Sequence, residues 1–304
     1  MKRIRTVPIL LVPILLLLLG TVPNRAYAGG AGESAVSFMT IPLSARASAM
    51  GNTCAFSRNG DLSGAYLNPA VILGLEETRA AFSHQTGIAD DTLSSFIIGK
   101  PFANGVGALS FIYYNAGEIE LNDLTDNTRT ISAETDYVLS GIYSRKFADF
   151  STGLSVKFIQ SSLVEEFSAS AFAVDIGVLK YSRSGALPAL SLAVTNLGTK
   201  LKYNERGEKL PSAIRAGIVS DVYYNTTAAF DIIKPLDGDM KKNIGLEYEM
   251  AAGTFLRAGY QLDAGINAVS FGFGIKFQKF DINFGMAPDS AMNSRHILSM
   301  GFRW

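Results

Sequence analysis

The sequence predicts an all-β protein: a transmembrane antiparallel β-barrel of about fourteen strands around a short, partly helical N-terminal plug. Three observations predict this class: an export signal, alternating apolar and polar segments from Arg79 onward, and a last strand that ends on Trp304. We therefore divide the chain into a signal peptide (1–28), a plug segment (29–78) and a barrel (79–304).

The composition restricts the classes of function. The 304 residues carry 27 basic and 27 acidic side chains, so no basic surface for nucleic acid is expected. A hydrophobic fraction of 48% with 29 glycines suits a wall that faces lipid. The single cysteine, Cys54, and only two histidines argue against a disulfide or a metal site, and we expect no cofactor. The apolar setting of Cys54 predicts a buried, inert thiol.

The first 28 residues have the three parts of a secretory signal peptide. Basic Lys2, Arg3 and Arg5 precede an apolar run that ends at Leu19, and a small-residue box places cleavage between Ala28 and Gly29. The run is too short for a comfortable membrane helix, although an uncleaved anchor is the alternative. An exported chain without helical spans is periplasmic, secreted or a barrel of the bacterial outer membrane.

The plug segment contains one short helix and one rigid turn. Ser44 is a plausible N-cap for a helical run that ends at Met50, with Gly51 as its stop. Pro69 forces Asn68 out of the helical region. Asn68 and Pro69 either pin the plug against the barrel wall or form a turn before the first strand, and the sequence leaves both readings open.

Fourteen alternating segments follow, each long enough to cross a bilayer as a tilted strand. They cover residues 79–86, 92–100, 104–114, 136–147, 151–160, 168–180, 189–197, 212–222, 226–233, 242–250, 253–262, 267–277, 279–287 and 295–304. Connections after even-numbered segments are short, and those after odd-numbered segments tend to be longer. This alternation is typical of a membrane barrel and has no counterpart in a soluble sandwich, the alternative fold.

In a barrel, the polar parity of these strands faces the lumen. It carries the charged residues Lys157, Asp175, Arg215, Asp221, Asp231, Glu247, Glu249, Arg257, Lys276 and Asp281. The last strand shows the same division, with Phe302 and Trp304 on its apolar parity. We expect this aromatic C-terminus to be read by barrel-assembly machinery; an ordinary strand of a soluble sheet is the alternative.

Several motifs before the first strand resemble a known family. Ser44-Ala-Arg46, Met50-Gly51 and Asn68-Pro69-Ala70 match the run and the Asn-Pro-Ala motif of the PorV/PorQ proteins, which are FadL-like outer-membrane barrels. The stretch from Asn196 to Tyr203, followed by Leu210-Pro211, is also similar. The resemblance implies a fourteen-strand barrel with an N-terminal plug. The chain departs from the family between Cys54 and Gly60, which affects plug detail more than the fold.

The resemblance implies two functions. PorV-like proteins act in type IX secretion, where they bind the C-terminal signal domain of exported proteins, and FadL-like proteins pass hydrophobic molecules through the barrel. We favour non-enzymatic docking, because the inward parity is more charged than apolar, with loops 115–135 and 198–210 touching secreted proteins or other secretion components. A channel for hydrophobic molecules is the alternative.

No catalytic centre is expected. His84 and His296 have no nucleophile motif beside them, so they read as interfacial histidines. Tyr113 and Tyr114 read as aromatic side chains at the membrane interface, where they would contact outer-membrane lipid.

Overall fold

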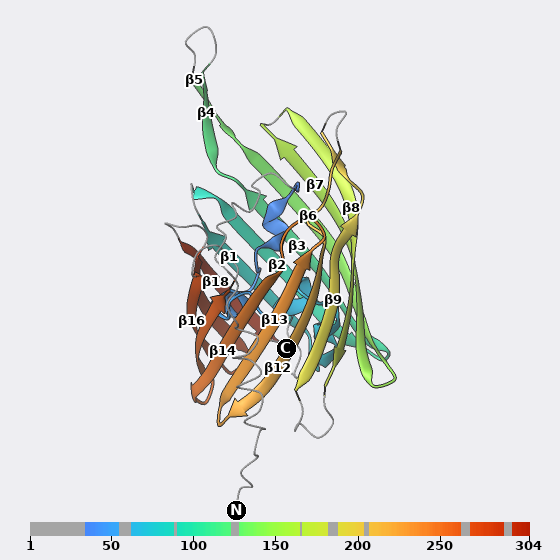
Figure 1. The fold of residues 1–304 in the computed structure, drawn as a ribbon, viewed down its shortest axis with the longest axis vertical. Coiled ribbons are helices and arrows are strands. Elements are labelled where there is room, and N and C mark those ends of the chain that lie inside the picture. The colour runs from blue at the N-terminus through green and yellow to red at the C-terminus, as the bar shows by residue number, and fades with distance from the viewer. Residues whose placement is uncertain are drawn as a thin grey trace, which may run out of the picture.

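The computed structural model describes residues 34–54, 62–87, 90–122, 128–164, 166–181, 188–203, 207–262, 268–288 and 294–304. Within them the chain forms a closed antiparallel barrel of fourteen strands, with the N-terminal segment running inside it (Figure 1). The predicted fold class is therefore confirmed. The predicted signal peptide and its cleavage site, Ala28 and Gly29, lie outside the described residues.

Each predicted segment corresponds to one strand of the wall. The strands are β1 (Arg79–Thr86), β2 (Thr92–Phe102), β3 (Gly105–Asn115), β6 (Glu134–Phe147), β7 (Phe150–Leu163), β8 (Phe167–Lys180), β9 (Ala189–Gly198), β12 (Ala213–Tyr223), β13 (Thr226–Pro235), β14 (Lys241–Ala251), β15 (Thr254–Gln261), β16 (Ala268–Phe277), β17 (Phe280–Pro288) and β18 (Ser294–Arg303). Strand β1 pairs with β18 from Arg79↔Arg303 to Thr86↔His296, which closes the ring. Closure is required because an open edge would leave unpaired backbone groups in hydrocarbon.

The two rims of the barrel differ as the connections predict. Tight turns join β2 to β3, β6 to β7, β14 to β15 and β16 to β17 at one rim. The opposite rim carries two hairpins, formed by β4 (Glu118–Asn122) with β5 (Thr128–Ser132) and by β10 (Leu201–Lys202) with β11 (Gly207–Glu208). The β4–β5 hairpin projects well beyond the wall (Figure 1). Short turns of outer-membrane barrels face the periplasm, so the hairpins lie on the extracellular side.

The outer surface of the barrel is apolar, and the protein is an outer-membrane barrel. Large side chains such as Phe111, Phe172 and Phe271 are 43%, 59% and 52% exposed. In water such a surface would be a severe aggregation hazard, whereas hydrocarbon covers it without cost. Tyr113 lies on this side, but the expectation for Tyr114 was wrong: it has the inward parity of β3 and stacks on Phe38 of the plug. No helix of the described ranges is both long and apolar enough to span a membrane.

The described residues of the plug form four short helical elements. They are η1 (Ser37–Thr40), α2 (Ala45–Ala49), η2 (Ser63–Tyr66) and η3 (Pro69–Gly74). Ser44 caps α2 by accepting a hydrogen bond from the Ala47 amide, and Gly51 follows its end with a φ of 71°. Asn68 caps η3 in the same way, through the Ala70 amide. The caps satisfy backbone amides at the start of α2 and η3, and apolar contacts with the wall stabilise both elements further.

Candidate functional site in the barrel lumen

The plug fills the middle of the lumen through two apolar clusters. Nearer the periplasm, Met50, Leu62, Val71 and Ile72 of the plug pack with wall residues Ile97, Val106, Ile142 and Leu179. Nearer the extracellular rim, Phe38 and Leu43 pack with Leu93, Ile112, Val138 and Ile159. The described plug residues therefore occupy the lumen along much of its length.

Glycines in the wall let the α2 region approach the strands closely. Gly245 and Gly259 face each other across β14 and β15, and a side chain at either would collide with Met50 or Gly51. Polar contacts supplement this fit. The Ala45 amide donates to Ser299 Oγ at 2.9 Å, and the Gly51 amide donates to Ser270 Oγ at 3.0 Å. This side of the plug is thus held by backbone groups as well as by side chains.

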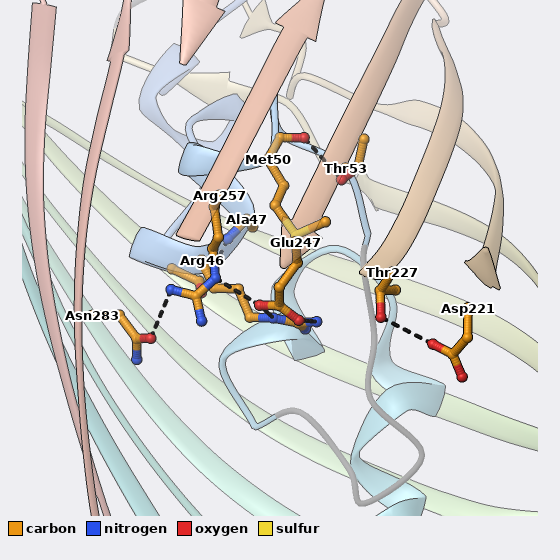
Figure 2. Close-up of polar contacts among 10 residues, drawn as sticks. Arg46, Ala47, Met50, Thr53, Asp221, Thr227, Glu247, Arg257 and Asn283 are labelled. Carbon is orange, nitrogen blue, oxygen red and sulfur yellow. Dashed lines mark hydrogen bonds and ion pairs between the residues drawn. The ribbon is translucent and has the colours of Figure 1, made fainter. Parts of the chain in front are cut away.

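A charged network joins α2 to the wall (Figure 2). Arg46 donates from Nε to Glu247 Oε2 and from Nη2 to Glu247 Oε1, both at 2.7 Å. Arg257 donates to the same carboxylate at 2.6 Å and to Asn283 Oδ1 at 2.9 Å. Two-point contacts between guanidinium and carboxylate are strong and directional. Because Arg46 is on the plug and Glu247 on β14, this contact ties the two parts together.

A second buried pair holds the chain just after α2. Arg215 donates to Asp231 Oδ2 at 2.7 Å and to the Asn52 carbonyl at 2.8 Å. The Cys54 amide donates to the same Asp231 oxygen at 2.8 Å. Cys54 itself is 2% exposed, as its apolar setting predicts.

The Asn68-Pro69-Ala70 motif sits against the other side of the wall. Asn68 Nδ2 donates to Ser191 Oγ on β9 at 2.8 Å. Gly153 and Gly177 face each other across β7 and β8, and a side chain at either would collide with Asn68, Pro69 or Ala70. Asn68 is fully buried. Asn68 and Pro69 therefore both form a turn and contact the barrel wall.

The lumenal wall is divided into a charged part and an apolar part. Strands β12 to β17 carry Arg215, Asp231, Glu247 and Arg257, whereas the inward residues of β2, β3 and β6 are mainly apolar or serine. Lys157 and Asp175, on β7 and β8, form a buried pair at 2.7 Å. The expectation that the whole inward parity is more charged than apolar is therefore wrong. Six of the predicted lumenal charges, all buried, form three ion pairs with each other, and three of these six also bind the plug.

A cavity of about 630 Å³ lies on the periplasmic side of the plug. Its lining includes Arg46 and Ser63 of the plug, and Arg79 and Arg303 from the ends of the wall. The predicted lumenal charges Asp221, Glu249, Lys276 and Asp281 also line it. The cavity is thus a polar vestibule that ends at α2.

The predicted site residues do not form one cluster. Ser44, Arg46, Met50 and Gly51 lie against β14 to β18, and Asn68, Pro69 and Ala70 lie against β7 to β9. The rings of Phe302 and Trp304 stack on the outer face with their centroids 5.4 Å apart. The role of these two residues in barrel assembly stays a prediction. His84 and His296 also lie on the outer parity. In the described part of the chain, no group of His, Cys, Asp or Glu is arranged to hold a metal ion.

Sequence reasoning missed the partners of these residues. Nothing in the sequence marks Glu247 as the partner of Arg46, 201 positions away. The Arg295–Asp91 pair, at 2.7 Å near the extracellular rim, was also missed. The glycines that alternate with apolar residues on β14 to β17 were the available signal, because a glycine in a strand often marks close approach of another backbone.

Comparison with known proteins establishes the fold. No protein-family model matches the chain, and no curated protein matches it in sequence. Among solved structures, the toluene transporter TodX of Pseudomonas putida has a TM-score of 0.66 at 11% identity, over 86% of this chain and 98% of that one. The monoaromatic hydrocarbon channel CymD has a TM-score of 0.61 at 12% identity, over 87% and 98%. The likeness shows that the chain shares the barrel fold of these two proteins. The narrower resemblance to PorV/PorQ stays an interpretation.

Arg46→Ala is expected to loosen the plug. The change removes both hydrogen bonds from the plug to Glu247 but leaves Glu247 paired with Arg257. A loss of about 2 kcal/mol would raise the open fraction roughly thirtyfold. Leakage of a small charged dye from proteoliposomes measures this. Lys209→Ala is the control, because it breaks an exposed extracellular pair with Asp237; leakage equal to wild type in both variants would contradict the role of Arg46.

Proposed function

We propose that the protein is a channel by which small hydrophobic molecules cross the outer membrane, with the N-terminal segment as its plug. The observation that carries this is an apolar stripe on the lumenal wall. Leu93, Ile112 and Val138 form its extracellular part, and Ile97, Ala108 and Ile142 form its periplasmic part. The buried serines Ser110 and Ser140 lie between the two parts. The plug covers this stripe with apolar side chains of its own.

The stripe suits an apolar solute on energetic grounds. Transfer of a Phe-sized group from water to an apolar surface contributes about 1.5–3 kcal/mol. A solute of that size could replace plug contacts with contacts of the same kind when the plug shifts. The paired charges on β12 to β17 offer no such surface. The fold shared with TodX, a toluene transporter, and with CymD, a monoaromatic hydrocarbon channel, supports the same conclusion.

Uptake of labelled toluene by proteoliposomes tests the proposal. Wild-type protein is expected to speed toluene entry over empty liposomes and to leave glucose entry slow. Ile142→Asn places a polar amide in the stripe, and desolvation of that amide is expected to lower the toluene rate by about tenfold. Thr227→Asn, on the polar side of the vestibule, is the matched control. Toluene entry no faster than in empty liposomes would refute the channel.

Docking of exported proteins is the second candidate, and the β4–β5 hairpin is the observation that favours it. The hairpin projects from the extracellular rim (Figure 1), and its Ile119 is 39% exposed. Pull-down of the detergent-solubilised protein tests this. Recovery of exported proteins that share one C-terminal domain is the expected result for docking, and its absence, with hydrophobic molecules co-purifying, leaves the channel alone.

A further inference from the structure

Asp136 is a carboxylate in an unusual position. It lies near the extracellular end of β6, on the inward parity with Val138, and is fully buried. Its wall neighbours are Tyr114 on β3 and Ser161 on β7. The side chain therefore stands at the extracellular end of the apolar stripe.

Aromatic rings surround this end of the lumen. Phe38 of the plug stacks on Tyr114 with the ring centroids 4.8 Å apart. Tyr203, from the β10–β11 hairpin, donates a hydrogen bond to Ser161 Oγ at 2.6 Å. Burial raises the pKa of the Tyr203 hydroxyl to about 12, so it remains a donor at neutral pH. Ile112 and Val138 form the apolar floor beneath.

Asp136 differs from the other buried carboxylates of the described lumen. Asp91 pairs with Arg295, Asp175 with Lys157, Asp231 with Arg215, and Glu247 with Arg46 and Arg257. Neither oxygen of Asp136 accepts a hydrogen bond of ordinary geometry, and no Lys or Arg of the described residues forms an ion pair with it. Glu134, two residues away on the same strand, repels the negative charge of Asp136 and can share a proton with its carboxyl group.

A buried carboxylate without a cation is destabilising. The carboxylate of Asp136 lies beside aromatic rings and above apolar side chains. A primary ammonium group matches each part: it carries the missing charge, donates up to three hydrogen bonds, and is attracted to aromatic faces. An attached apolar body would lie on the stripe.

We propose that Asp136 binds the ammonium group of small hydrophobic amines that enter the barrel. This rests on the proposed channel function and narrows its solutes to a class with one cationic end. Tyr114 and Phe38 contact the body of the amine next to its charge, and Ile112 and Val138 contact the rest. Phe38 belongs to the plug, so an amine at Asp136 shares its site with the segment that closes the lumen.

Titration calorimetry of the full-length protein in detergent tests the site, with 2-phenylethylamine as the probe. Asp136→Asn keeps the shape of the side chain and removes its charge, and we expect amine affinity to fall by at least about tenfold. Asp221→Asn, which removes a carboxylate from the vestibule, is the control and should leave affinity unchanged. Both variants are measured in the same detergent, so partition of the amine into micelles contributes equally to each titration.

Two further probes define what would overturn the proposal. Binding of 2-phenylethanol should not change in Asp136→Asn; an equal loss would show recognition of any donor rather than of a cation. Methylamine should bind at least about tenfold more weakly than 2-phenylethylamine, because it lacks the apolar body. Equal amine affinity in wild type and Asp136→Asn would overturn the site. Toluene uptake by proteoliposomes is measured separately. A protein that binds the amine but does not speed toluene entry would contradict the channel function and still support the amine site.

Discussion

A wall one strand thick, with hydrocarbon on its outer side, has only the lumen in which to place polar side chains. Most charged groups there pair across a narrow space, because an unpaired buried charge is unstable. The pairs of Arg46 with Glu247, of Arg215 with Asp231 and of Lys157 with Asp175 follow from this constraint. Two of these pairs also bind the plug, so the requirement that internal charges be paired is what positions the N-terminal segment.

The plug contacts the wall in two ways that have different consequences. Against β14 to β17 it is held by directional polar contacts and by glycines that admit its backbone, as at Gly245 and Gly259. Against β2, β3 and β6 it is held by apolar contact with residues such as Ile97 and Ile112, which an apolar solute could replace. The charged part therefore fixes where the plug sits, and the apolar part determines what could take its place.

Much of the fold could be predicted from the sequence, because strand parity in a barrel is a local property. The fourteen strands and the cap at Ser44 follow from residues close together in the chain. The site could not, since its partners meet only after closure: Arg46 and Glu247 are 201 positions apart. The inward face is less charged than the sequence predicts, because serines and aliphatic residues of β2, β3 and β6 share it with the charged residues. Tyr114 lies inside the barrel although its sequence position predicts the membrane interface, because a tyrosine near a strand end suits either face.

Hydrophobic solutes are expected to pass through the lumen only when the plug leaves the wall. Cys54, the only cysteine, reports this directly because it lies on the plug and is 2% exposed. Its rate of reaction with a membrane-impermeant maleimide can be followed in proteoliposomes while toluene uptake is measured. Cys54 of the wild-type protein should react slowly at rest and faster during toluene uptake, and the Arg46→Ala variant should react faster still. Full toluene uptake while Cys54 stays unlabelled would contradict this expectation.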